Sequence, residues 1–153
     1  MFDYTMEHIC SYSATLHSPF EAIGETPLGL RVNGYVSGGE VNGPRLRGRV
    51  RPVGGDWLTI RRDGMGMLDV RATMETDDGA LIDVQYQGLM DLGGDGYARM
   101  LAGDLPARVA IRAVPRLVCA HPDYLWLNRL QCLNVGEVDF ASSAVRYDMY
   151  AVR

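Results

Sequence analysis

Two Asp-Gly turns constrain the possible folds of this chain more than any other feature of its sequence. Asp63-Gly64 and Asp77-Asp78-Gly79 separate three segments, residues 56–62, 65–76 and 80–87, in which apolar and polar residues alternate. Alternation with a period of two is typical of a β-strand that is buried on one face. Asp-Gly favours a tight hairpin because its glycine adopts positive φ without strain. The middle of the chain therefore predicts a three-stranded antiparallel meander.

Turn residues separate short alternating segments along the rest of the chain as well. The 18 glycines and 7 prolines fall mostly between short alternating runs, which is typical of all-β proteins. Further strands are expected at residues 4–16, 30–37, 45–51, 107–119, 124–135 and 144–152, with a loop at residues 24–29. One short helix is expected at residues 97–102, ended by Gly103. We predict one domain over residues 1–153, a closed antiparallel β-barrel of lipocalin-like size with roughly nine or ten strands.

Composition limits the partners of such a barrel. Hydrophobic residues are 47% and charged residues 22% of the chain, as in globular proteins. The formal net charge of −4 weighs against nucleic acid or an anionic membrane as the main partner. No apolar run approaches the ~20 residues that span a bilayer, and the first residues lack the pattern of a secretory signal. We expect a cytoplasmic protein with no nucleic-acid partner and no membrane partner.

Cysteines and histidines are too scattered to indicate a metal site or a disulfide framework. They are Cys10, Cys119 and Cys132, and His8, His17 and His121. An odd number of distant cysteines fits reduced thiols, and no pair has the spacing of metal ligands. Residues 93–96 are rich in glycine but do not follow a strand, as a phosphate-binding loop would. We therefore expect no metal and no cofactor.

The register of the central meander predicts an interior that mixes apolar and charged side chains. If both turns are two-residue loops, Arg62 lies opposite Met65 and Glu75 lies opposite Ile82. One face then carries Asp56, Leu58, Ile60, Arg62, Met67, Asp69, Arg71, Thr73, Glu75, Ile82, Val84 and Tyr86. A barrel that encloses a ligand needs apolar walls with a few convergent polar groups. A structural ion pair on a wet face is the alternative, and a slip of one residue would invert the assignment.

Several separated blocks resemble the family catalogued as domain of unknown function 3237. The blocks are Gly43-Pro44-Arg45-Leu46-Arg47-Gly48-Arg49-Val50, Gly55-Asp56-Trp57, Arg62-Asp63-Gly64, Leu68-Asp69-Val70-Arg71, Glu75-Thr76-Asp77-Asp78-Gly79-Ala80, Arg112, Pro115-Arg116 and Tyr124-Leu125-Trp126-Leu127-Asn128-Arg129. The resemblance covers nearly the whole chain. It implies a β-barrel, often oligomeric, with a pocket inside, and relatives that act as cofactor-free cyclases or isomerases beside natural-product pathways. The chain departs from the pattern at residues 40–42 and 117–119, so substrate identity is not carried over.

The mixed face and the resemblance together predict a cofactor-independent acid/base enzyme. It would be an isomerase, cyclase or lyase that acts on a small aromatic or polyketide-like molecule inside the barrel, in natural-product biosynthesis. Asp69 or Glu75 would be the general acid or base, and Arg71 would stabilise developing negative charge. Tyr86, opposite Arg71 on this register, would relay a proton, its phenolate favoured by the nearby cation. Substrate contacts are expected from Asp56, Arg62, Trp126 and Asn128.

Two other functions are compatible with the same sequence. A non-catalytic carrier would need the cavity but no group with a shifted pKa, and an oligomeric structural module would have a filled barrel. For Trp126 and Asn128, core packing is the alternative to pocket lining, with Asn128 bonded to a neighbouring backbone. We expect a homo-oligomer, with dimer and tetramer both open.

Overall fold

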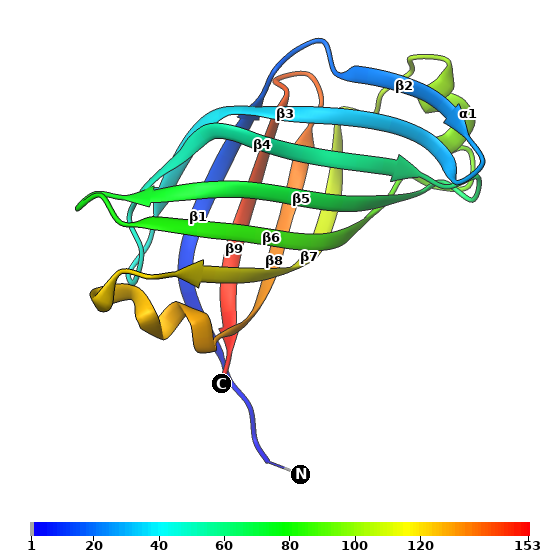
Figure 1. Ribbon diagram of the computed structural model, residues 1–153. Coiled ribbons are helices and arrows are strands. Elements are labelled where there is room, and N and C mark those ends of the chain that lie inside the picture. Colours follow the sequence, from blue (N-terminus) through cyan, green and yellow to red (C-terminus); the bar gives the residue numbers. More distant parts are fainter. Residues whose placement is uncertain (1) are drawn as a thin grey trace.

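Eight strands close into an antiparallel barrel, and a ninth lies outside the ring (Figure 1). The computed structural model describes residues 2–153. Its elements are β1 (Met6–Leu16), β2 (Glu21–Thr26), β3 (Gly29–Asn42), β4 (Gly48–Ile60), β5 (Met65–Thr76), β6 (Leu81–Asp91), α1 (Gly96–Leu101), β7 (Arg108–Cys119), the 3₁₀ helix η1 (Pro122–Arg129), β8 (Gln131–Asp139) and β9 (Ala144–Val152). The strands follow the order β1-β9-β8-β7-β6-β5-β4-β3, and pairing of β1 with β3 completes the ring. The predicted closed antiparallel barrel is confirmed.

Alternation of side chains along each strand builds the core. In β7 every second residue is buried and every other one is exposed, from Arg108 to Cys119. The buried residues include Ile111, which joins Ile82 and Met149 among the fully buried side chains. Full burial of each such side chain contributes about 1.5–3 kcal/mol to folding. The hydrophobic effect therefore fixes which face of each strand turns inward.

The loop between β4 and β5 is one residue longer than the sequence predicts. The Arg61 N–H donates to the Met65 carbonyl oxygen at 2.9 Å, which leaves residues 62–64 in the loop. Gly64 has φ +82°, the left-handed conformation that closes a three-residue hairpin loop. The loop between β5 and β6 has the same form, because Met74 pairs with Ile82 and Gly79 has φ +88°.

Each of the two longer loops shifts the strand register by one residue. Together they exchange the inner and outer faces of β5 and leave those of β4 and β6 as predicted. The predicted inward faces of β4 and β6 are correct, because the second shift cancels the first. On β5 the predicted face is wrong. The inward residues are Leu68, Val70, Ala72 and Met74, and the outward residues are Met67, Asp69, Arg71, Thr73 and Glu75.

Residues 124–135 are not one strand. Pro122 begins η1, where its fixed φ and missing N–H are tolerated, and the His121 ring accepts a hydrogen bond from the Asp123 N–H. Within η1 the partly buried Tyr124 and the buried Leu127 both pack on the core at a spacing of three, which fits a 3₁₀ helix. The helix expected at residues 97–102 is confirmed as α1. Among residues 2–153, no helix is long and apolar enough to cross a membrane.

The two hairpin glycines offer a matched test of backbone approach. A Cβ on Gly64 would lie 1.7 Å from the Gly93 carbonyl oxygen, whereas a Cβ on Gly79 would meet open space. We expect Gly79→Ala to cost about 1 kcal/mol of unfolding free energy, from positive φ alone. Gly64→Ala should cost clearly more, because the 93–96 segment must also move. Urea denaturation measures both losses, and equal losses would contradict this close approach.

Candidate functional site

The barrel encloses a cavity of about 80 Å³ whose wall is almost entirely apolar. An engineered apolar cavity of roughly 150 Å³ holds benzene, so a ring-sized ligand requires that this wall adjust. Met74, Met90 and Met100 line the cavity, and flexible thioether side chains adapt to such a change. The polar side chains among the lining residues are Tyr12, Asp56, Tyr86 and Tyr147. A bound molecule would therefore meet one carboxyl group and three phenols.

Asp56 supplies the carboxyl group from β4, in the row that pairs Asp56 with Val70 and Val70 with Tyr86. Its Oδ1 accepts a hydrogen bond from the Asp69 N–H at 3.0 Å, where a strand neighbour would normally offer a backbone carbonyl. Burial raises the pKa of Asp56 to about 7, opposed by this hydrogen bond and assisted by the Asp69 carboxylate. Protonated and ionised forms of Asp56 are therefore both populated near neutral pH.

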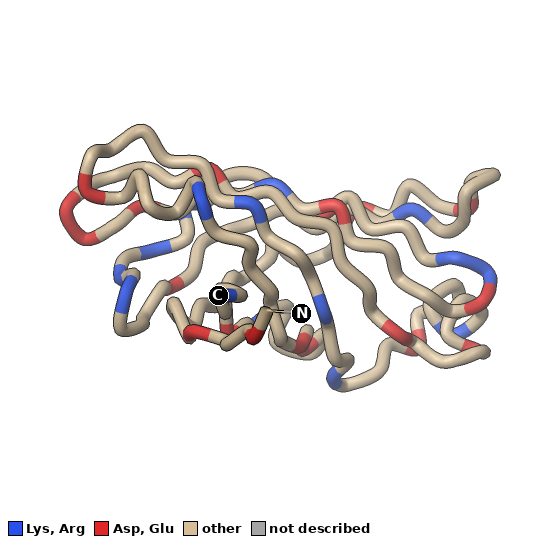
Figure 2. Tube along the Cα trace, turned by 90° about the horizontal axis from the view of Figure 1, so that it is seen from below, with Lys and Arg blue, Asp and Glu red and all other residues tan. Residues whose placement is uncertain are grey.

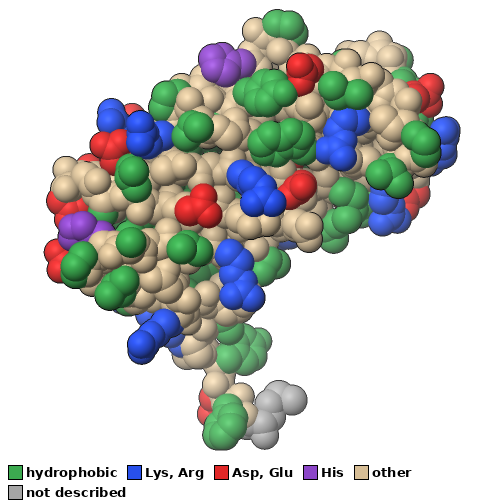
Figure 3. Space-filling model, viewed as in Figure 1, with side chains coloured by type: hydrophobic (Ala, Val, Ile, Leu, Met, Phe, Trp, Pro, Cys, Tyr) green, Lys and Arg blue, Asp and Glu red, His purple; other side chains and the backbone are tan. Residues whose placement is uncertain are grey.

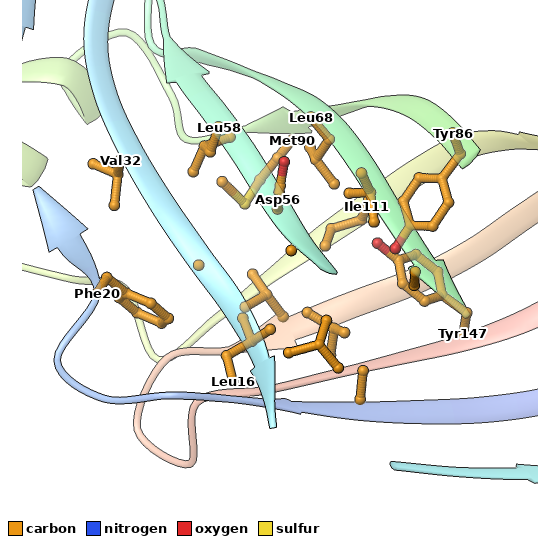
Figure 4. Close-up of a pocket in the computed structure, with 18 of the residues that line it drawn as sticks. Leu16, Phe20, Val32, Asp56, Leu58, Leu68, Tyr86, Met90, Ile111 and Tyr147 are labelled. Atoms are coloured by element: carbon orange, nitrogen blue, oxygen red, sulfur yellow. The ribbon is translucent and has the colours of Figure 1, made fainter. Parts of the chain in front are cut away.

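The three phenols form one cluster across the barrel interior. The ring centroids of Tyr12 and Tyr147 are 5.1 Å apart, and those of Tyr86 and Tyr147 are 5.8 Å apart. Figure 4 shows Tyr86 and Tyr147 at one end of the cavity, with Asp56 between them and the opposite end. Burial raises the pKa of all three tyrosines well above the ordinary value, so they are neutral hydrogen-bond donors. Among residues 2–153, the buried Tyr147 hydroxyl makes no hydrogen bond of good geometry, although the neighbouring Tyr86 phenol is close enough to influence its pKa.

Asn134 holds one of these phenols from behind. It is fully buried on β8, and its Nδ2 donates to the Tyr12 hydroxyl oxygen at 2.6 Å. Because that oxygen accepts from Asn134, the Tyr12 proton is left to donate elsewhere. A polar residue at an inward position of β8 is the sequence signal for this group. Tyr12 and Tyr147 give a weaker signal, because each is one apolar position in an alternating strand.

Of the eight residues predicted for the site, the structure places Asp56 and Tyr86 at the cavity. Asp69, Arg71 and Glu75 lie on the outer wall of β5, which corrects their expected inward placement. Glu75 pairs there with Arg49 at 3.0 Å and Arg51 at 3.6 Å. These three residues face outward because the three-residue loops at both ends of β5 exchange its inner and outer faces.

The outer wall explains where the charged side chains go. Figure 3 shows them interspersed with hydrophobic ones on the face seen in Figure 1, and Figure 2 shows acidic and basic positions mixed along the strands and loops. Tyr86 lies opposite Val70, whereas Arg71 lies opposite Gln85. The expected phenolate of Tyr86 beside a cation is therefore wrong, and Tyr86 is a neutral phenol.

Arg62 is also outside the cavity. It lies in the loop between β4 and β5, with 74% of its side chain exposed. Its guanidinium group is 3.9 Å from the Glu25 carboxylate and 5.3 Å from the centroid of the Tyr97 ring. These contacts connect the loop to β2 and α1, so Arg62 cannot hold a ligand inside the barrel in this arrangement.

Trp126 and Asn128 belong to η1 and not to the cavity wall. The Arg45 guanidinium group lies 4.5 Å from the centroid of the Trp126 ring. Asn128 accepts from the Cys119 N–H and donates to the Cys119 carbonyl oxygen, both at 2.8 Å. Asn128 thus follows the alternative of a bond to neighbouring backbone.

The cavity offers no built site for a cation or an anion. Among residues 2–153, no group of three or more His, Cys, Asp or Glu side chains could hold a metal ion. The residues that line the cavity, all within this described part, include no Lys, Arg or His. The chemistry of these side chains is therefore proton transfer and hydrogen bonding.

Comparisons with known proteins identify relatives along the whole chain. A family model described as "Protein of unknown function (DUF3237)" matches residues 4–152. A UPF0311 protein of Rhodopseudomonas palustris is 32% identical over 131 residues, 84% of this chain and 84% of that protein. The crystal structure of a β-barrel-like protein from Acinetobacter baumannii matches with a TM-score of 0.85 at 26% identity, covering 100% of this chain and 98% of that one. The structure of an enzyme from Penicillium herquei shares the fold alone, with a TM-score of 0.66 at 18% identity and coverage of 100% and 97%.

The raised pKa of Asp56 predicts a pH-dependent stability. The unfolded chain loses this proton near pH 3.8, whereas the folded chain keeps it up to about pH 7, so the free energy of unfolding falls as the pH rises between these values. We expect the contribution to be on the order of 2 kcal/mol, because one pKa unit is worth ~1.4 kcal/mol and Asp56 is only partly buried. Asp56→Asn should remove this fall in urea denaturation, and ¹³C NMR of the carboxyl carbon should give the pKa directly.

Asp83→Asn is the matched control, because Asp83 is exposed on the outer wall of β6. This variant should keep the fall of stability with pH. An identical pH dependence in wild type and Asp56→Asn would refute the raised pKa.

Proposed function

We propose that this chain, which belongs to the DUF3237 family of proteins of unknown function, is a cofactor-independent acid/base enzyme. It would bind a small, largely apolar molecule inside the barrel and move a proton through Asp56. The observation that carries this proposal is a carboxyl group with a pKa of about 7 in a largely apolar cavity that also holds three neutral phenols. A general acid or base is most effective when its pKa lies near the working pH.

The proposed reaction begins with Asp56 as a base. The ionised carboxylate takes a proton from a carbon next to a carbonyl group of the substrate. The electron pair of that C–H bond forms a C=C bond, and negative charge moves to the carbonyl oxygen. The neutral phenols of Tyr147 and Tyr86 donate hydrogen bonds to this oxygen as its charge grows.

Asp56 then acts as an acid. Where the substrate carries a C=C bond one carbon further from the carbonyl group, the carbonyl group re-forms, that double bond shifts, and the protonated carboxyl group returns its proton to the far carbon of the former double bond. This completes an isomerisation without any other reactant. A cyclisation uses the same intermediate, when its carbon attacks an electrophilic carbon of the substrate and Asp56 protonates the oxygen that receives the charge. Both reactions leave Asp56 in its starting form.

A catalytic role fits the Tyr147 hydroxyl, which makes no hydrogen bond of good geometry, better than a structural role does. A buried polar group without a full hydrogen bond costs up to about 1–3 kcal/mol of stability, and a substrate oxygen would relieve this cost. The barrel is also the fold of the protein from Penicillium herquei that is described as an enzyme. We further propose an aromatic or polyketide-like substrate in natural-product biosynthesis, and a cytoplasmic homo-oligomer as its setting. A non-catalytic carrier is the second candidate, because the apolar cavity by itself suits one.

Deuterium exchange tests proton transfer with simple ketones in place of the natural substrate. The protein is incubated in D₂O at neutral pH with enolisable ketones such as cyclohexanone and 2-tetralone, and mass spectrometry follows deuterium at carbon. We expect exchange above the buffer rate for wild type. Asp56→Asn should lower the protein-dependent rate by about 10²-fold, as loss of an acid/base group does. Tyr147→Phe should lower it by about 10²-fold, through loss of one oxyanion donor.

The controls keep the same chemistry on the outer surface. Asp83→Asn and Tyr150→Phe should exchange at the wild-type rate, because Asp83 is exposed and Tyr150 packs against His8 on the other face of β9. Exchange that survives in Asp56→Asn would overturn the proposal. A ketone that binds in the cavity without exchange would instead support the carrier.

A further inference from the structure

The cavity has a partly exposed end. Several lining residues retain partial exposure, and they come from chain segments that meet at one end of the barrel. They are Leu16, Phe20, Val32, Met100, Phe140 and Val145. The Phe20 and Phe140 rings meet edge to face with centroids 6.3 Å apart, and the Leu16 N–H donates to the Ser143 carbonyl oxygen at 2.8 Å. This end is therefore the mouth of the cavity.

The opposite end is closed and polar. Tyr12 and Tyr86 are each 6% exposed and Tyr147 is 3% exposed, so solvent does not reach this cluster. Figure 4 shows Phe20, Leu16 and Val32 on one side of Asp56, and Tyr86 and Tyr147 on the other. Along its length the cavity thus changes from apolar at the mouth to hydrogen-bonding at the closed end.

This gradient determines how a ligand must be oriented. A ligand that placed an apolar tail at the closed end would leave the buried Tyr147 hydroxyl with only the neighbouring Tyr86 phenol, to which it makes no hydrogen bond of good geometry. It would also place its own polar atoms against the phenylalanines of the mouth, which offer no hydrogen bonds. The reverse orientation satisfies both ends at once.

The charge of the cavity determines the ionisation of the ligand. An anion entering here would meet the Asp56 carboxyl group, and none of the lining residues in the described chain offers a positive charge. Burying an unpaired charge is costly. A neutral hydroxyl or carbonyl group, by contrast, exchanges hydrogen bonds with the phenols and with Asp56.

We propose that the ligand is a neutral amphipathic molecule that enters oxygen end first. Its phenol, enol or ketone oxygen lies against Tyr147 and Tyr86, and its apolar tail packs against Phe20 and Phe140 at the mouth. This inference rests on the cavity that the proposed function uses, but it concerns binding and not proton transfer.

Calorimetric titration with 4-alkylphenols tests the orientation, because the alkyl chain lies opposite the hydroxyl group. From 4-methylphenol to 4-propylphenol and 4-pentylphenol, the affinity should rise about two- to fourfold for each methylene that the mouth buries. Tyr147→Phe should weaken all three phenols by a similar factor and leave this increment unchanged. Phe20→Ala should reduce the increment while leaving the affinity for 4-methylphenol nearly unchanged. At pH 8, 4-propylbenzoate should bind at least about tenfold more weakly than 4-propylphenol, because its carboxylate faces ionised Asp56.

Two further variants keep the test decisive. Leu89→Ala, at an exposed position on the outer wall of β6, should change neither quantity. Phe140→Ala should reduce the chain-length increment in the same way as Phe20→Ala. It replaces Phe20→Ala in the test if that variant folds poorly. An unchanged chain-length increment in both mouth variants, or no binding of any phenol by wild type, would overturn the inference. Phenols that bind as described, without deuterium exchange of ketones, would leave the inference standing while the proposed function fails.

Discussion

The pairing of β1 with β3 is the contact on which the rest of the structure depends. Residues 11–16 of β1 lie along residues 36–42 of β3 and turn a sheet with two edges into a ring. Gly39 allows this approach, since a Cβ there would lie 1.9 Å from the Ser13 carbonyl oxygen. Without the ring, water would reach the inner faces of β4 and β9. The cavity, its low polarity and its chemistry all follow from closure.

Enclosure acts on the carboxyl group and on the phenols in one direction. Removal from water disfavours the charged form of each, so Asp56 keeps its proton to a higher pH and the tyrosines stay protonated. As a result, the Asp56 carboxyl group gains and loses its proton near neutral pH, whereas the neighbouring phenols donate hydrogen bonds and keep their protons. That difference comes from the ordinary pKa values of a carboxylic acid and a phenol, displaced together by one environment.

Much of the fold could be predicted from the sequence, because period-two patterns and glycine turns are local signals. The predicted face of β5 is wrong, although Leu68, Val70 and Met74 form a clean apolar set on their own. Counting residues through an assumed two-residue turn places these apolar residues on the outer face of β5. In the structure they face inward, because burying them is favoured by the hydrophobic effect. In η1, the spacing of three between Tyr124 and Leu127 is present in the sequence, but the alternation of residues 124–135 also fits a strand.

The site is less predictable than the fold, for a geometric reason. Asp56 and Tyr86 lie on nearby strands of the meander, so local counting finds them. Tyr12 and Tyr147 come from the first and last strands and meet Tyr86 only after the barrel closes. Asn134 does not reach the cavity wall at all, and its contact with Tyr12 depends on the packing of β8 against β1 through β9.

The paired loops at residues 62–64 and 77–79 have a consequence for how such barrels diverge. Deleting one residue from the first loop would turn β5 and every later strand inside out, and deleting one from the second would do so to β6 and every later strand. Deleting one from each would invert β5 alone and leave β6 and all later strands in their present orientation. A change of one residue in the length of one loop must therefore be matched by a change of one residue in the other if the later strands are to keep their inner faces. Sequence drift in this lineage should tolerate compensating pairs of length changes more readily than a single one.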